Sequence, residues 1–102
     1  MIDIKPKIVC LCGSTKFKKE YEAAILNETL KGHITLSVGC FMHADKVLIT
    51  EEEKQDLDQL HLRKIDLADE VLVVCPGGYI GPSTTREIAY AVTRDKPIRY
   101  RT

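Results

Sequence analysis

Two uninterrupted apolar runs, each followed by a glycine-containing loop, constrain the fold of this chain more than any other feature. The first lies in residues 7–12 and stops at Gly13, and the second covers residues 71–75, just before the loop 76–82. A short apolar run without polar alternation predicts a strand that is buried on both faces, as in parallel sheets. We therefore expect helices to cover both faces of one sheet.

The rest of the sequence supplies these helices and two further strands. The pattern predicts helices over residues 14–31 and 50–68 and from about residue 83, and strands over residues 33–38 and 97–100. Residues 39–49 show no period and are expected to form a loop. Strands that alternate with helices indicate an α/β fold with a parallel sheet.

Side chains at the helix starts refine these predictions. We expect Ser14 to be the N-cap of the first helix, and Thr50 with Glu53 has the spacing of a capping box for the second. In the third helix the apolar pattern places three side chains toward the core: Ile88, Ala89 and Val92.

Right-handed crossovers leave few arrangements for four such strands. We predict a single domain over residues 1–102, a three-layer Rossmann-like or flavodoxin-like fold with the strand order 2-1-3-4 and helices on both faces. Ligands of such sheets bind at the carboxyl edge, where successive connections diverge to opposite faces. The loops after Cys12 and Cys75 would both open there.

Composition excludes some classes of partner. The chain has 15 Lys and Arg against 15 Asp and Glu, so its formal net charge is zero, which argues against binding a nucleic acid polymer. No apolar run approaches the roughly 20 residues that span a bilayer, and no signal-peptide pattern opens the sequence. We expect a cytoplasmic protein without a membrane partner.

The four cysteines are interpreted as reduced thiols. Three of them, Cys10, Cys12 and Cys75, lie in or beside apolar runs, which favours burial over disulfide formation. Cys10 and Cys12 are separated by one residue and no second pair follows, so their spacing along the chain does not predict a metal site.

The two glycine-containing loops are candidate anion sites, because each leads into a helix whose first N–H groups are free. Each could equally be an ordinary strand-to-helix turn. The candidate phosphate-binding or sugar-binding residues are Gly13, Ser14, Lys16, Gly78, Gly81, Ser83 and Thr84.

Two residues are candidates for catalysis. Glu87 lies about one turn into the third helix, where it is either a surface glutamate or a carboxylate that attacks a sugar carbon. His61 shares a helix face with Leu57 and Ile65, and is either a core histidine or a group for proton transfer.

Other polar residues are assigned to the long loop or to the opposite edge of the sheet. His43 and Asp45 lie in the long loop that could cover the site. The acidic cluster Asp66, Asp69 and Glu70 precedes a strand, so we expect it at the amino edge and solvated, with Asp66 paired to a lysine or arginine.

Three segments resemble the nucleoside 2-deoxyribosyltransferase family, which includes deoxynucleoside 5′-monophosphate N-glycosidases. They are Cys12-Gly13-Ser14, the strand in residues 69–74, and the segment Arg86-Glu87-Ile88-Ala89-Tyr90-Ala91 before a closing Lys-Pro-Ile strand. The similarity extends over roughly residues 7–100.

The resemblance implies cleavage of the N-glycosidic bond of a small deoxynucleoside or its 5′-monophosphate, with transfer of the sugar to water or to another base. It implies that Glu87 is the nucleophile, that Ser14 and Ser83 hold the phosphate, and that no cofactor is used. His61 falls where the family has an aspartate that protonates the base. The family's members are homo-oligomers, so a homodimer or larger assembly is expected.

Two other functions fit the same sequence features. The protein could be a non-catalytic module that binds or senses a nucleotide in the same crevice. It could also be a phosphocysteine carrier, because a cysteine, Cys10 or Cys12, lies at the end of the first strand before a Gly-Ser-Thr loop.

Overall fold

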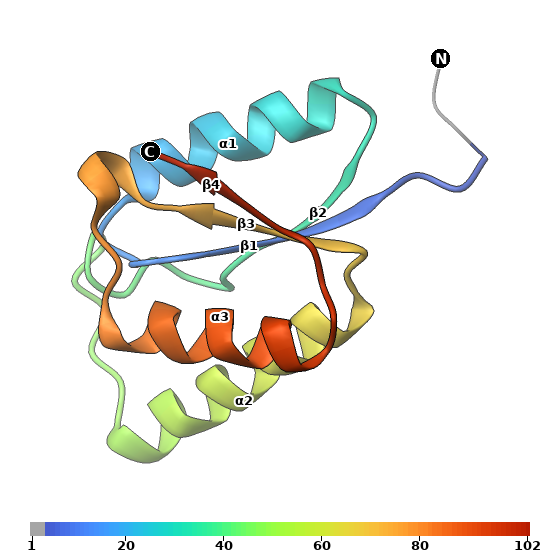
Figure 1. The fold of residues 1–102 in the computed structure, drawn as a ribbon. Coiled ribbons are helices and arrows are strands. Elements are labelled where there is room, and N and C mark those ends of the chain that lie inside the picture. The colour runs from blue at the N-terminus through green and yellow to red at the C-terminus, as the bar shows by residue number, and fades with distance from the viewer. Residues whose placement is uncertain (1–3) are drawn as a thin grey trace.

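The computed structural model describes residues 4–102 and alternates strands with helices along the chain (Figure 1). The elements are β1 (Ile8–Gly13), α1 (Lys18–Leu30), β2 (Ile34–Leu36), α2 (Glu51–Leu67), β3 (Glu70–Val74), the short 3-10 helix η1 (Pro76–Gly78), α3 (Pro82–Thr93) and β4 (Ile98–Arg101). The predicted order of elements is confirmed, and β2 is shorter than the expected strand over residues 33–38.

The four strands form one sheet in the order β2-β1-β3-β4, and every neighbouring pair is parallel. The longest pairing joins β1 to β3, from Val9 beside Glu70 to Gly13 beside Val74. Both central strands are therefore the apolar runs of the sequence. The predicted α/β class, strand order and parallel pairing are confirmed.

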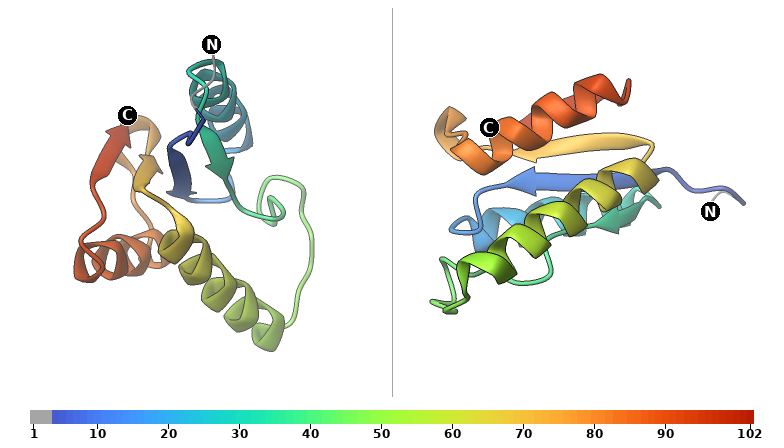
Figure 2. Two further views of the ribbon diagram at one scale, coloured as in Figure 1. Left: turned by 90° about the vertical axis from the view of Figure 1, so that its right-hand side faces the viewer. Right: turned by 90° about the horizontal axis from the view of Figure 1, so that it is seen from below.

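The helices form the two outer layers, with α1 on one face of the sheet and α2 and α3 on the other (Figures 1 and 2). Alternate residues of β1 pack against the two helical layers, because successive side chains of a strand point to opposite faces of the sheet. Val9 and Leu11 pack toward Tyr21 of α1, whereas Cys10 and Cys12 pack in the cluster that holds Ile65 of α2.

Helix α2 begins as the sequence predicts. The Thr50 hydroxyl accepts a hydrogen bond from the backbone N–H of Glu53, and the Glu53 carboxylate accepts one from the N–H of Thr50. Because this capping box satisfies two N–H groups at the helix start, the helix can begin next to an irregular loop.

The prediction that Ser14 is the N-cap of α1 is wrong. The backbone N–H of Phe17 donates to the Ser14 carbonyl over 3.1 Å, which closes a turn, and the helix starts only at Lys18. Phe17 occupies the cap position without a side-chain hydrogen bond. Ser14 therefore lies in the connecting loop, at the carboxyl end of β1.

The prediction of which α3 side chains face the core is also wrong in part. Ala89 and Val92 are exposed, and the buried residues of this helix are Thr84 and Ala91, with Ile88 partly buried. Residues 84, 88 and 91 share one face at helical spacing. The same face carries Glu87, although a charged side chain usually lies on the solvent-exposed face of a helix.

At the amino edge of the sheet, Asp66 is paired as expected, with Arg63 at 3.0 Å and Arg94 at 3.7 Å. The prediction of a solvated Glu70 is wrong. Glu70 is 8% exposed and forms ion pairs with Lys7 and Arg99, which compensate the burial of its charge. The acidic cluster lies away from the carboxyl edge.

Within residues 4–102, no helix is long and apolar enough to cross a bilayer.

Candidate active site

A pocket of about 280 Å³ opens at the carboxyl edge of the sheet. Its walls come from the loop after β1, the long loop after β2, residues 54–64 of α2, the loop after β3 and the start of α3. Seven of the nine predicted site residues line it: Gly13, Ser14, His61, Gly81, Ser83, Thr84 and Glu87. The fold thus brings together residues up to 74 positions apart in the chain (87 − 13).

Lys16 and Gly78 do not line this pocket. The Lys16 ammonium lies 3.8 Å from the centre of the Tyr79 ring, in a cation–π contact that turns it toward the loop surface. Gly78 is exposed at the end of η1 and has a φ of 83°, so its role is to form the turn after β3.

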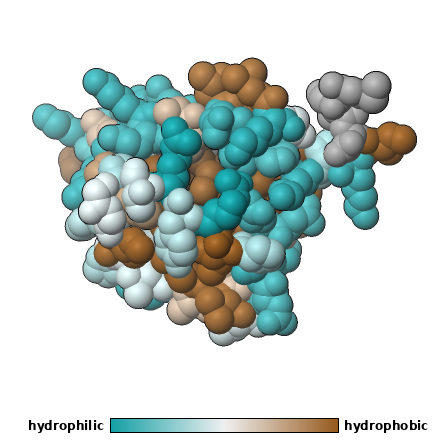
Figure 3. Space-filling model, turned by 45° about the horizontal axis from the view of Figure 1, so that its top comes forward, coloured by the Kyte–Doolittle hydropathy of each residue, from teal (hydrophilic) through white to brown (hydrophobic). Residues whose placement is uncertain are grey.

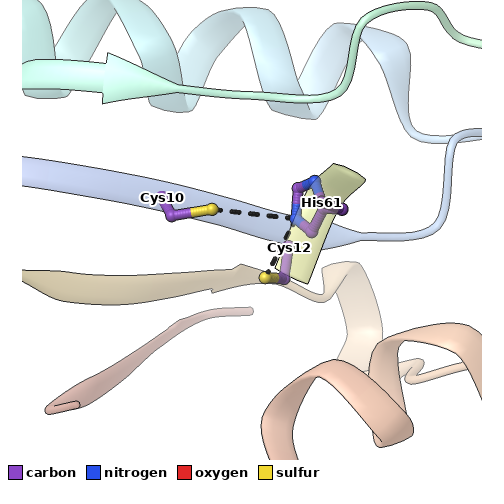
Figure 4. A group of neighbouring side chains, drawn as sticks. All are labelled: Cys10, Cys12 and His61. Atoms are coloured by element: carbon purple, nitrogen blue, oxygen red, sulfur yellow. Dashed lines mark hydrogen bonds between the residues drawn. The ribbon is translucent and has the colours of Figure 1, made fainter. Parts of the chain in front are cut away.

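His61 lies at the base of the pocket and is only 5% exposed. Its Nε2 is 3.7 Å from Cys10 Sγ and 3.3 Å from Cys12 Sγ (Figure 4). Burial alone lowers the pKa of His61, but the Cys10 hydrogen bond and the Glu87 charge outweigh it, so the pKa lies above the ordinary value. Nδ1 is the ring nitrogen left for a ligand.

The two thiols differ in acidity. A hydrogen bond from Cys12 lowers the pKa of Cys10 against the effect of burial, and His61 lowers it further. The same hydrogen bond, together with burial, raises the pKa of Cys12. Cys10 is therefore the more acidic of the two thiols.

Glu87 extends from the first half of α3 into the pocket wall and is partly buried. Burial raises the pKa of its carboxyl group, and the Cys10 charge raises it further, whereas His61 lowers it. A carboxylate with little solvent around it is suited to nucleophilic attack on an electrophilic carbon.

The start of α3 supplies hydrogen-bond donors. The first turn of a helix leaves N–H groups without intrahelical partners, here those of Ser83 and Thr84, since Pro82 has none. Lys54 of α2 lies on the same wall, with its Nζ 3.5 Å from Ser83 Oγ. The combination of N–H groups, hydroxyls and an ammonium can hold an anion.

Sequence reasoning missed three charged residues of the pocket, Lys54, Asp58 and Lys64, of which Lys54 and Asp58 form an ion pair over 3.1 Å. Lys54 and Asp58 lie seven and three positions before His61, and Lys64 lies three positions after it, so the spacing of α2 contained the signal that places them on one helix face. Asp58 is a second acid within the pocket, one turn from His61.

The long loop does contribute to the pocket, as expected for His43. Its Nδ1 lies 2.5 Å from Thr15 Oγ1, which ties this loop to the loop after β1. Asp45 does not line the pocket, because it pairs with Lys18 of α1 over 2.9 Å. The long loop is thus held by one contact to the loop after β1 and by another to the start of α1.

All four cysteines are free thiols, and Cys10, Cys12 and Cys75 are buried as expected. Neither Cys10 nor Cys12 has exposed surface, and neither lines the pocket. A phosphocysteine carrier needs a sulfur that a phosphate donor can reach. The packing of these two side chains therefore argues against that function.

The fold and the pocket define an α/β protein with a pocket at the carboxyl edge of a parallel sheet, which is where doubly wound folds bind their ligands. No protein-family model matches the sequence, and a comparison with curated proteins finds no match.

Proposed function

We propose that this protein cleaves the N-glycosidic bond of a 2′-deoxynucleoside or its 5′-monophosphate, with Glu87 as the nucleophile. The observation that carries the proposal is the position of Glu87, a partly buried carboxylate in the wall of a pocket that also contains acids and an anion-binding helix start. The resemblance to nucleoside 2-deoxyribosyltransferases supports the same role for this residue.

In the first step, a Glu87 oxygen forms a bond to C1′ of the sugar as the bond from C1′ to the base nitrogen breaks. The electron pair of the broken bond goes to the base, which takes a proton from an acid in the pocket. Water or a second base then attacks C1′, frees Glu87 and completes hydrolysis or transfer.

Two groups in the pocket are candidates for the acid that protonates the base. His61 offers Nδ1, since its Nε2 faces the two sulfur atoms. Asp58 lies one turn earlier on the same helix and is held by Lys54. Both residues lie on α2, across the pocket from the loop that carries Ser14.

A 5′-phosphate would bind at the start of α3. Ser83 and Thr84 supply N–H and hydroxyl donors there, Lys54 adds a positive charge, and Ser14 contributes a hydroxyl from the loop after β1. A phosphate at a helix N-terminus is stabilised by the free N–H groups and by the helix dipole. This arrangement favours the monophosphate over the nucleoside.

The test is to incubate the purified protein with each of the four deoxynucleoside monophosphates and the four nucleosides, and to measure free base by chromatography. We expect base release by the wild type, and a rate at least about 1,000-fold lower for Glu87→Gln, because loss of a nucleophile removes the covalent route. Glu52→Gln, an exposed glutamate at the start of α2, is the matched control and should keep the wild-type rate.

Equal base release by Glu87→Gln and the wild type would contradict the assignment of the nucleophile. If the wild type binds a nucleotide by calorimetry but releases no base from any of the eight compounds, the protein is the non-catalytic nucleotide-binding module that the same pocket would allow.

A further inference from the structure

Beneath the pocket, three metal-binding side chains from two elements converge. Cys10 and Cys12 are two residues apart in β1, so both sulfur atoms leave the same face of the sheet, the face that α2 and α3 cover. His61 of α2 points its Nε2 at both of them (Figure 4). The three donor atoms lie within 4.8 Å of one another, and all three residues are buried.

The spacing of these atoms fits a tetrahedral ion. With Zn–S bonds of about 2.3 Å and Zn–N bonds of about 2.0 Å, a tetrahedral site separates sulfur from nitrogen by about 3.5 Å and sulfur from sulfur by about 3.8 Å. The two observed distances from sulfur to Nε2 are 3.3 and 3.7 Å, one on each side of that value. The two sulfur atoms lie within 4.8 Å of each other, so the side chains need only move together to reach the tetrahedral spacing.

The charge of the three donors also suits a divalent ion. Two thiolates and a neutral imidazole together carry a charge of −2. A divalent cation compensates that charge in a place where water is largely excluded. His61 also lines the pocket, which gives an ion a path to the site.

The donor set also selects the type of metal. Thiolate and imidazole ligands in a tetrahedral arrangement favour Zn²⁺ and other soft or borderline ions over Mg²⁺ and Ca²⁺, which prefer oxygen. Cys75 lies in the same buried cluster as Cys10 and Cys12, but it is outside the group of three. Cys75 is therefore not one of the proposed ligands.

We propose that Cys10, Cys12 and His61 form a binding site for Zn²⁺ or a chemically similar cation. On binding, the two thiols lose their protons to solvent and the imidazole binds as the neutral ring.

The test is a titration of the reduced, chelator-treated protein with Co²⁺, followed by displacement with Zn²⁺. We expect one equivalent of Co²⁺ to bind with the near-ultraviolet charge-transfer band of a cobalt thiolate, and Zn²⁺ to remove that band. Cys12→Ser should bind more than about 100-fold more weakly, beyond what loss of a supporting partner costs. Cys75→Ser, a matched buried thiol, should bind as the wild type does.

The absence of a thiolate band at millimolar Co²⁺ would overturn the proposal. So would a band that survives in Cys12→Ser and disappears in Cys40→Ser, since Cys40 and His43 line the pocket and would then be the ligands. These readouts do not use catalysis, so failure of the metal site and failure of the proposed activity are separate results.

A measurement on the wild type covers the case in which Cys12→Ser does not fold. X-ray absorption of the zinc-loaded protein should give two sulfur neighbours at about 2.3 Å. A shell made of oxygen and nitrogen alone would overturn the proposal.

Discussion

The surroundings of Gly13 leave no room for a side chain. A Cβ atom at this position would lie 2.5 Å from the backbone carbonyl oxygen of Val74, in the neighbouring strand β3. The Tyr21 hydroxyl donates a hydrogen bond to the Gly13 carbonyl over 3.0 Å, which fixes this loop against α1. Gly13 is therefore required by close packing where the pocket meets the sheet.

We predict that Gly13→Ala lowers the free energy of unfolding by about 1–3 kcal/mol, because a backbone carbonyl cannot move aside without disturbing the sheet. Urea denaturation measures this. Gly39→Ala is the matched control, since Gly39 also lines the pocket but has nothing within 4 Å of an added Cβ. Its effect should stay within about 0.5 kcal/mol, and equal losses for both variants would contradict the explanation.

Single residues of the pocket could be predicted from the sequence, but contacts between distant residues could not. Glu87 and His61 were identified as candidates by residue type and element, and both line the pocket. The convergence of His61 with Cys10 and Cys12 was not predicted, because these residues are 51 and 49 positions apart and only the packing of α2 on β1 joins them. Spacing along the chain finds metal ligands only when they are close in sequence.

At the scale of elements, a buried ion pair joins α1 to β4. Glu28 of α1 is 1% exposed and accepts a hydrogen bond from Arg99 of β4 over 2.7 Å, while Lys31 and His33 contact the same carboxylate. Burial raises the pKa of Glu28, but these partners outweigh it and lower the pKa to about 2.

This pair predicts how stability depends on pH. Because the pKa of Glu28 is about 2 in the folded chain and ordinarily 4.5, its contribution is complete above about pH 4.5 and is lost as the pH falls toward 2. Glu28→Gln should be less stable than the wild type by about 1–2 kcal/mol at pH 7, a value reduced because Arg99 and Lys31 are partly exposed.

Urea denaturation of both proteins from pH 7 to pH 2 measures that difference, which should shrink below pH 4.5. Glu22→Gln, on the exposed side of α1, is the control and should match the wild type throughout. A difference for Glu28→Gln that stays constant over this range would contradict the role of its charge.

Elements differ in how well the sequence predicts them. Both apolar strands and the capping box of α2 follow from local pattern, and the structure confirms them. The inward face of α3 does not, because Glu87 is turned into the pocket and Ala89 and Val92 outward. A charged residue on the inner face disturbs the apolar periodicity on which the prediction depends.

At the scale of the whole molecule, the class and strand order were predictable because parallel strands with right-handed crossovers leave few alternatives. The shape of the pocket was not, since half of its wall comes from the loop after β2 and from polar positions of α2. Loops without a period give no sequence signal for where they fold back.

The described surface of the chain has exposed apolar side chains of the kind that oligomers bury between subunits. Figure 3 shows separate apolar patches on a face that is otherwise mainly hydrophilic. Large apolar side chains on α1 and β2 are exposed: Leu26 at 59%, Leu30 at 78% and Ile34 at 45%. Burial of such side chains between chains would be favourable.

We predict a homodimer or a larger homo-oligomer. Light scattering after size-exclusion chromatography should give a multiple of the 11.5 kDa chain mass. Leu30→Glu should reduce the mass if this surface is buried in the assembly. A mass of one chain across the concentrations used in the activity assay would contradict the prediction.

The most direct test of the central claim is to look for the covalent intermediate on Glu87. The protein is mixed with a deoxynucleoside monophosphate, quenched in acid within the first turnovers, digested and analysed by mass spectrometry. We predict a deoxyribosyl 5-phosphate adduct on the peptide that carries Glu87, and no adduct in Glu87→Gln. Free base released by the wild type with no adduct on that peptide, or with an adduct on another residue, would contradict the account.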